Sequence, residues 1–161
     1  MTVSQEEFRR SLGAFATGVG VVTCLADGQD HAMTANAIAS VSLEPPLILV
    51  GVNRAARFWE ALRGQQYWAL SVLAADAQPH AAWLATSGRP LQGQLDDVPH
   101  HRSTRGIALL DQALVTLECR TYDTVPAGDH MIVIGEVESA HPGTDADALL
   151  YWRSGYRRLA R

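Results

Sequence analysis

Short helical patterns alternate with strand-like apolar runs along the chain. At the start, Ser4 and Glu7 have the spacing of a helix capping box, and apolar side chains repeat at helical period over residues 8–15. We therefore predict an N-terminal helix that is ended by Gly18 and Gly20. A β-branched run over residues 19–25 then predicts a strand.

The middle of the chain carries its most continuous apolar stretch. Residues 47–52 (LILVGV) are typical of a strand buried on both faces. Asn53 follows with the residue type of a helix cap, so we predict a helix over residues 54–63. A strand over residues 67–73 and a helix that begins at Asp76 are predicted next.

The second half contains one long loop and two long strands. Residues 86–106 show no hydrophobic period and predict the loop. Residues 113–123 and 131–140 read as strands, connected by a hairpin loop over residues 125–129. Five or six hairpin-connected strands with inserted helices indicate an α+β, mainly β fold, arranged as an antiparallel barrel.

Composition narrows the function classes. The chain has 161 residues, of which 47% are hydrophobic and 19% charged, so we predict one globular domain over residues 1–161. All 13 basic residues are arginines, which excludes chemistry that needs a lysine, such as a Schiff base or a P-loop. The net charge of -4 argues against nucleic acid as a partner.

Metal and membrane binding have little support. Cys24 and Cys119 each lie in an apolar run without a CxxC partner, so we expect buried free thiols and no metal site. His100 and His101 are adjacent, so their side chains point apart. No apolar run is long enough for a membrane span or a signal peptide, and we expect a cytoplasmic protein.

Polar side chains recur at even spacing in a stretch rich in small residues. Thr34, Asn36, Ser40 and Ser42 would share one face of an extended chain. Such a face can hydrogen-bond the edge of a polar planar ring and bring hydroxyls to a phosphate. Taken alone, the same pattern is also typical of a solvated strand edge.

A second polar group follows the buried strand. Asn53, Arg54 and Arg57 lie at a predicted helix start, where exposed N–H groups and a guanidinium can bind an anion. Taken alone, Asn53 also fits a helix cap, and Arg57 a surface cation. The combination of this group with the preceding polar stretch favours a nucleotide site.

The order and spacing of several short motifs resemble the flavin reductase-like domain family. These motifs, in chain order, are FRRSLGAFATGV (8–19), VVT (21–23), MTAN (33–36), SVSL (40–43), PPL (45–47), GDH (128–130) and GEV (135–137). Members of this family are the reductase components of two-component flavin-dependent monooxygenases.

The resemblance implies a fold and an activity. It implies a split β-barrel of the FMN-binding type that works as a homodimer, with flavin near the subunit interface. It also implies an NAD(P)H-dependent flavin reductase, which transfers hydride from NADH or NADPH to FMN or FAD. The reduced flavin would then pass to a separate monooxygenase.

The resemblance also implies the site residues. His130 of the GDH motif would lie beside the nicotinamide as the catalytic residue. The cofactor-binding residues would be three at the isoalloxazine ring, three at the ribityl chain and phosphate, and three on the phosphate side: Thr34, Asn36 and Ala37; Ser40, Val41 and Ser42; Asn53, Arg54 and Arg57.

Two alternatives stay open at this point. Hydride transfer needs positioning of two rings and no protein nucleophile, which agrees with the residues present. A non-catalytic flavin- or haem-binding protein on the same split barrel is the first alternative, and the GDH motif disfavours it. A hydrolase that uses His130 is the second, but no nucleophile elbow is present.

Overall fold

The computed structural model describes residues 2–159. Its helices and strands, in chain order, are α1 (Gln5–Leu12), β1 (Thr17–Gly18), β2 (Gly20–Ala26), β3 (Gln29–Ala35), β4 (Ile38–Leu43), β5 (Pro46–Asn53), α2 (Arg57–Leu62), β6 (Tyr67–Leu73), the 3₁₀ turn η1 (Ala75–Ala77), α3 (Gln78–Ala85), β7 (His100–Arg102), β8 (Ala108–Leu110), β9 (Ala113–Ala127), β10 (His130–Pro142), β11 (Leu150–Trp152) and β12 (Gly155–Arg157). The α+β, mainly β character predicted from the sequence is confirmed.

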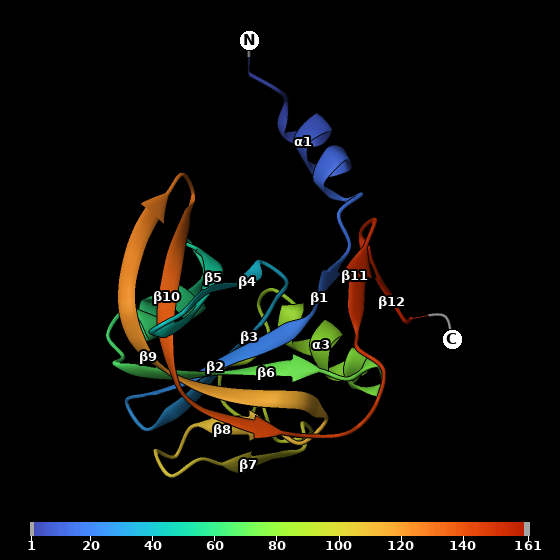
Figure 1. Cartoon of the computed structure of the whole chain (residues 1–161). Coiled ribbons are helices and arrows are strands. Elements are labelled where there is room, and N and C mark those ends of the chain that lie inside the picture. The colour runs from blue at the N-terminus through green and yellow to red at the C-terminus, as the bar shows by residue number, and fades with distance from the viewer. Residues whose placement is uncertain (1, 160–161) are drawn as a thin grey trace.

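One strongly curved antiparallel sheet organises the fold (Figure 1). Its seven strands run in the order β3-β2-β6-β9-β10-β5-β4. The two edge strands, β3 and β4, are consecutive in the chain and are joined only by Asn36 and Ala37. The sheet therefore curls until its edges approach each other, although β3 and β4 share no ladder within residues 2–159.

The hairpin between β9 and β10 is tighter than the sequence pattern predicts. A loop over residues 125–129 is expected, but Ala127 pairs with His130 and the turn consists of Gly128 and Asp129. Gly128 has a φ of +62°, a conformation that favours glycine. His130 is thereby the first residue of β10, directly after the turn.

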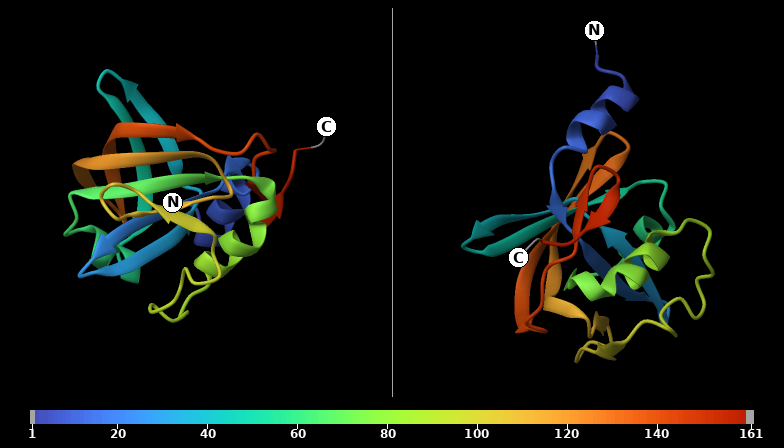
Figure 2. Two further views of the ribbon diagram at one scale, coloured as in Figure 1. Left: turned by 90° about the horizontal axis from the view of Figure 1, so that it is seen from below. Right: turned by 90° about the vertical axis from the view of Figure 1, so that its right-hand side faces the viewer.

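The predicted N-terminal helix is confirmed, but it is shorter than expected. The Ser4 hydroxyl accepts from the Glu7 N–H at 3.2 Å, and the Glu7 carboxylate accepts from the Ser4 N–H at 3.0 Å, which completes the capping box. The helix ends at Leu12 and buries none of its residues. Figure 2 shows α1 standing away from the sheet. No helix within residues 2–159 is long and apolar enough to cross a membrane.

Apolar side chains pack on both sides of the sheet. On one side, α3 contributes Ala81 and Leu84 to a buried cluster, and on the other, α2 contributes Phe58 and Leu62 to a cluster around Trp68. A Cβ atom at Gly135 would lie 2.4 Å from the Trp68 ring, so glycine lets β10 pass over the indole.

The prediction for residues 47–52 is wrong in one respect. Val50 and Val52 are fully buried, whereas Leu47 and Leu49 are half-buried. In this single chain, β5 therefore buries one face instead of two. The continuous apolar run leaves the other face of β5 apolar and partly open to solvent.

Candidate functional site

A cavity of about 540 Å³ opens between β3, the start of α2 and the loop that follows α3. The residues that line it come from these three segments: His31, Ala32, Met33 and Thr34; Ala55, Ala56, Arg57 and Phe58; Leu84, Ala85, Thr86, Ser87, Gly88, Arg89, Leu91 and Gln94. Two of the expected flavin-binding residues, Thr34 and Arg57, lie in this wall.

Two arginines meet at the cavity. The Arg57 guanidinium donates to the main-chain carbonyl of Arg89 at 3.1 Å. Arg89 in turn donates from Nη1 to the Thr86 carbonyl at 3.0 Å and from Nη2 to the Ala32 carbonyl. Burial, followed by the charge of Arg57, lowers the pKa of Arg89. Two cations held this close favour an anion between them.

Two polar atoms in the cavity wall have no hydrogen-bond partner. Nε of Arg89 and Nδ1 of His31 are both buried and unpaired. Burial lowers the pKa of His31, and the Arg57 charge lowers it further, against the opposing effect of Asp30. The residues of the wall therefore include a buried N–H donor without a partner and a titratable ring beside two guanidinium groups. These residues fit the anionic, phosphate-bearing end of a nucleotide.

Thr34 borders the cavity, but its hydroxyl group already donates a hydrogen bond within the protein. Its Oγ1 donates to the Ala81 carbonyl of α3 at 2.7 Å. This bond fastens β3 to α3 and shapes the cavity wall. Only the oxygen lone pairs of Thr34 remain to accept from a ligand.

The expectation that Thr34, Asn36, Ser40 and Ser42 share one extended face is wrong. The chain leaves β3 after Ala35 and enters β4 at Ile38, on the opposite edge of the sheet. The β4–β5 register also shifts between Ser40 and Ser42, around Val41. These positions therefore lie on two edges that the curl of the sheet brings together, and not on one strand face.

Asn36 and Ala37 form the link between the two sheet edges. The Asn36 amide donates to the Thr17 hydroxyl at 3.2 Å, and the Ala37 carbonyl accepts from the Gly51 N–H at 2.8 Å. Both residues are exposed. They lie outside the wall of the cavity, so a ligand that touches both places must extend from the cavity along the edge of β3.

Asn53 does not cap a helix over residues 54–63. It is the last residue of β5, its Oδ1 accepts from the Ala55 N–H at 2.8 Å, and α2 begins at Arg57. The helix starts later because the Arg54 N–H donates to the Asp129 carbonyl at 2.9 Å, which draws the chain across to the β9–β10 turn. Asn53 and Arg54 therefore connect the cavity segment to that turn.

His130 lies at that turn and opposite Asn53. The two residues are Cα partners in the β5–β10 ladder. The His130 ring is half-exposed, and its Nδ1 lies 2.8 Å from Oδ1 of Asp129. A carboxylate only accepts, so Nδ1 carries the proton in this bond. Within residues 2–159, no hydrogen bond engages Nε2 of this ring.

The sequence interpretation missed His31 and Arg89 as residues of this site. Arg89 lies in the stretch that shows no hydrophobic period, and His31 lies at the start of a weakly patterned strand. The only signal was a Ser-Gly-Arg sequence directly after a helix, which offers a flexible turn and a cation. Its relation to Arg57 depends on folding.

The cysteines and histidines elsewhere suggest no second reactive centre. Burial raises the pKa of both Cys24 and Cys119 to about 12, so neither thiol ionises near neutral pH. Within residues 2–159, no three His, Cys, Asp or Glu side chains come together as a metal-binding group.

Comparison with known families identifies the class of protein. The flavin reductase like domain matches residues 12–160. The chain therefore belongs to this family, which confirms the resemblance carried by its sequence motifs.

Individual relatives are similar to this chain over nearly its whole length. The reductase component of 4-hydroxyphenylacetate 3-monooxygenase from Thermus thermophilus is 35% identical, over 96% of this chain and 97% of the relative. The structure of BorF, the flavin reductase component of a bacterial two-component tryptophan halogenase, superposes with a TM-score of 0.91 and 39% identity, over 98% of this chain and 99% of BorF. SgcE6, an NADH:FAD oxidoreductase of Streptomyces globisporus with bound NAD and FAD fragments, has a TM-score of 0.91 and 33% identity, over 99% and 97% of the two chains.

Proposed function

We propose that this chain is an NADH-dependent flavin reductase that supplies reduced FMN or FAD to a separate flavin-dependent monooxygenase. The observation that carries the proposal is the arginine-lined cavity, which is joined through residues 53–57 to the His130 turn in a chain of this family. The cavity would bind the phosphate of one nucleotide, and the His130 turn would bind the second nucleotide, so that their two rings can come together. The names of two relatives, a monooxygenase reductase component and an NADH:FAD oxidoreductase, support this proposal.

The flavin phosphate would bind at the cavity. Arg57 and Arg89 in the cavity wall would supply the positive charge that binds it, and Nε of Arg89 is buried without a partner there. Ser87 and Thr86 lie in the same wall, although the Thr86 hydroxyl already donates to the Ala82 carbonyl at 3.0 Å. Because the chain contains no lysine, guanidinium groups, hydroxyls and backbone N–H groups must do all of this binding.

The rest of the flavin would follow the edges of the sheet. Thr34, Asn36 and Ala37 would border the isoalloxazine ring, and residues 40–42 of β4 would reach the ribityl chain. The short link between β3 and β4 brings these two groups to one place. We also infer that the curled sheet is the split β-barrel of the FMN-binding type, within a single domain over residues 1–161.

His130 would bind the nicotinamide. In the Nδ1–H tautomer, the ring would present the Nε2 lone pair, which can accept from the carboxamide N–H of the nucleotide. When both nucleotides are bound, the nicotinamide supplies a hydride that the flavin ring accepts. The protein contributes orientation of the two rings and exclusion of water, because the transfer needs no protein nucleophile.

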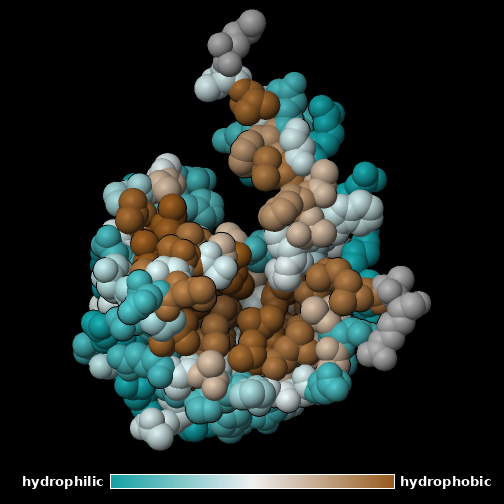
Figure 3. Space-filling view, viewed as in Figure 1, coloured by the Kyte–Doolittle hydropathy of each residue, from teal (hydrophilic) through white to brown (hydrophobic). Residues whose placement is uncertain are grey.

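We further infer that the chain works as a homodimer. Large apolar side chains remain exposed on separate elements: Phe8, Leu12 and Phe15 at 54%, 50% and 70%, Val41 and Leu43 of β4 at 48% and 95%, and Tyr122 of β9 at 55%. In Figure 3, apolar side chains gather where the surface is hollowed between α1 and the β9–β10 hairpin. A second copy would cover this face, next to the His130 turn.

Steady-state assays with NADH or NADPH and with FMN or FAD test the proposal. We expect turnover with NADH and at least one flavin, and the preferred pair identifies the natural substrates. We also expect the chain in the cytoplasm, where its nicotinamide donor is recycled. Tight flavin binding with no nicotinamide oxidation in any of the combinations would instead favour the non-catalytic flavin-binding alternative.

A further inference from the structure

The β9–β10 turn contains the carboxylate of Asp129, which is hydrogen-bonded to the ring of His130. Asp129 precedes His130 in the two-residue turn, and its Oδ1 lies 2.8 Å from the Nδ1 atom of the ring. The side chain of Asp129 is 85% exposed and that of His130 44% exposed. Both side chains are therefore accessible to solvent.

We propose that Asp129 is a positioning residue for the reaction, which sets the tautomer and the orientation of the His130 ring so that Nε2 faces the nicotinamide. This inference rests on the proposed function. A carboxylate accepts only, so a ring bonded to it through Nδ1 carries its proton there and leaves Nε2 as an acceptor. A histidine without this partner would divide between both tautomers and rotate about its side-chain bonds.

Main-chain hydrogen bonds hold Asp129 and His130 in place, although both side chains are exposed to solvent. The Asp129 carbonyl accepts from the Arg54 N–H at 2.9 Å, and His130 pairs with Asn53 in the β5–β10 ladder. The backbone on both sides of the Asp129–His130 bond is thus attached to the segment that continues to Arg57. The same contacts set the position of the ring relative to the cavity.

The charges around Asp129 keep its carboxylate ionised. The hydrogen bond to His130 is the main cause that lowers its pKa, the charge of His130 comes next, and the charge of Arg9 on α1 contributes last in the same direction. Asp129 therefore remains an acceptor near neutral pH. Asp129→Ala removes the acceptor without touching the backbone bond to Arg54, which makes it a clean test.

The first experiment measures the tautomer, without any nucleotide. The chain contains six histidines, so ¹⁵N-histidine NMR spectra of the wild type and of His130→Ala assign the His130 signals by difference. We expect the Nδ1–H tautomer in the wild type and a shift of the proton toward Nε2 in Asp129→Ala. An unchanged His130 tautomer in Asp129→Ala would overturn the proposal, whether or not the chain is a reductase.

The second experiment is a double-mutant cycle on NADH-dependent flavin reduction. We expect Asp129→Ala to slow hydride transfer about fivefold to tenfold, comparable to one hydrogen bond in a half-exposed site, with flavin affinity unchanged. Asp129→Asn keeps an acceptor oxygen and should restore most of the rate. Asp123→Ala removes a charge from the same hairpin, away from His130, and should resemble the wild type.

The cycle separates failure of this inference from failure of the proposed function. In a His130→Ala background, Asp129→Ala should cause no further loss, because Asp129 acts through the ring. An equal loss in both backgrounds, or no loss in the wild-type background, would overturn the positioning role. A wild-type chain that reduces no flavin with NADH would contradict the proposed function, and the NMR result would still decide whether Asp129 sets the ring tautomer.

Discussion

The guanidinium of Arg57 donates to the main-chain carbonyl of Arg89 at 3.1 Å, although the two residues are 32 positions apart in the chain. This bond joins the start of α2 to the loop after α3 and closes one side of the cavity. The two cations repel each other unless an anion lies between them. An arrangement of this kind is stabilised when a phosphate binds.

Arg57→Gln tests the phosphate role. We expect the dissociation constant for FMN to rise about 10- to 100-fold, because a charge-assisted hydrogen bond contributes roughly 1.5–3 kcal/mol. Affinity for riboflavin, which lacks the phosphate, should change little. The measurement is fluorescence titration of both flavins against the wild type and the variant.

A matched control lies at the other end of the same helix. Arg63 is exposed and pairs with Glu60 at 2.8 Å, so Arg63→Gln should leave both affinities unchanged. Equal weakening of FMN and riboflavin binding in Arg57→Gln would contradict a phosphate contact. It would indicate that the substitution distorts the flavin site as a whole.

His130→Ala tests the nicotinamide role. We expect NADH-dependent flavin reduction to slow by about 10²-fold, since the ring orients the donor at the reacting position, while flavin affinity stays near the wild-type value. Stopped-flow reduction and flavin titration measure the two quantities separately. His101→Ala, which removes an exposed histidine on β7, serves as the control. Equal losses of flavin binding and reduction rate would show that His130 acts on the flavin side.

The pH dependence of stability should report on His31. Its pKa in the folded chain is lowered below the ordinary value of 6.5, first by burial and then by Arg57. The unfolded chain therefore binds more protons between these two values, so stability is fully present above pH 6.5 and is lost as the pH falls through the folded pKa. We expect His31→Gln to lose less thermal stability than the wild type between about pH 8 and pH 5. Parallel Tm curves for the two proteins would contradict this assignment.

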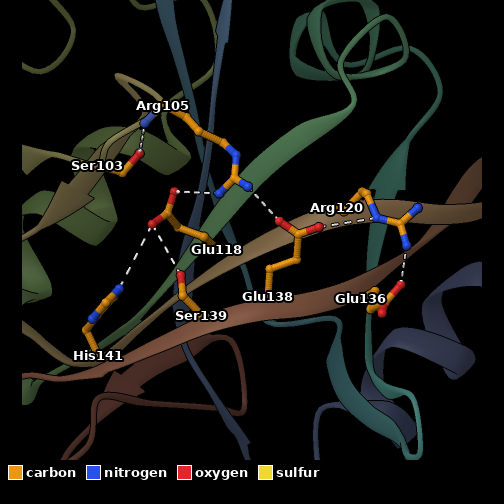
Figure 4. A network of polar contacts seen from close by, with 8 residues as sticks. All are labelled: Ser103, Arg105, Glu118, Arg120, Glu136, Glu138, Ser139 and His141. Carbon is orange, nitrogen blue, oxygen red and sulfur yellow. Dashed lines mark hydrogen bonds and ion pairs between the residues drawn. The ribbon is translucent and has the colours of Figure 1, made fainter.

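A polar network on the sheet allows a stability prediction (Figure 4). Glu118 is 6% exposed and lies 3.7 Å from Arg105, which also pairs with Glu138 at 2.7 Å. Arg105→Ala leaves the buried carboxylate without this partly exposed cation, so we expect a loss of about 1–3 kcal/mol in urea unfolding. In a Glu118→Gln background the same change should cost clearly less. An equal cost in both backgrounds would mean that Arg105 stabilises through its contact with the Tyr67 ring, which its guanidinium carbon approaches to 4.2 Å.

The sequence predicted those parts of the fold that depend on neighbouring residues. The capping box of Ser4 and Glu7 involves side chains and backbone within a few positions of each other. Local signals were less reliable where a distant contact intervenes. Asn53 has the residue type of a helix cap, but the bond from Arg54 to Asp129 displaces the helix start to Arg57.

The site was predicted in part for the same reason. Arg57 was identified because an arginine near a helix start is a recognisable pattern, and Thr34 because it belongs to a family motif. Arg89 and His31 could not be found, because their relation to Arg57 arises from the packing of β3, α2 and the loop after α3. The even spacing of residues 34–42 misled, because the chain crosses from one sheet edge to the other at Asn36 and Ala37.

Anaerobic mixing of the purified chain with NADH and oxidised flavin tests the central claim most directly. The account predicts that the visible absorbance of the flavin bleaches while NADH is consumed in equal amount, in a reaction that depends on the protein. Admission of oxygen should then restore the flavin colour. If neither FMN nor FAD bleaches with NADH, under conditions in which the folded chain binds flavin, the account is contradicted.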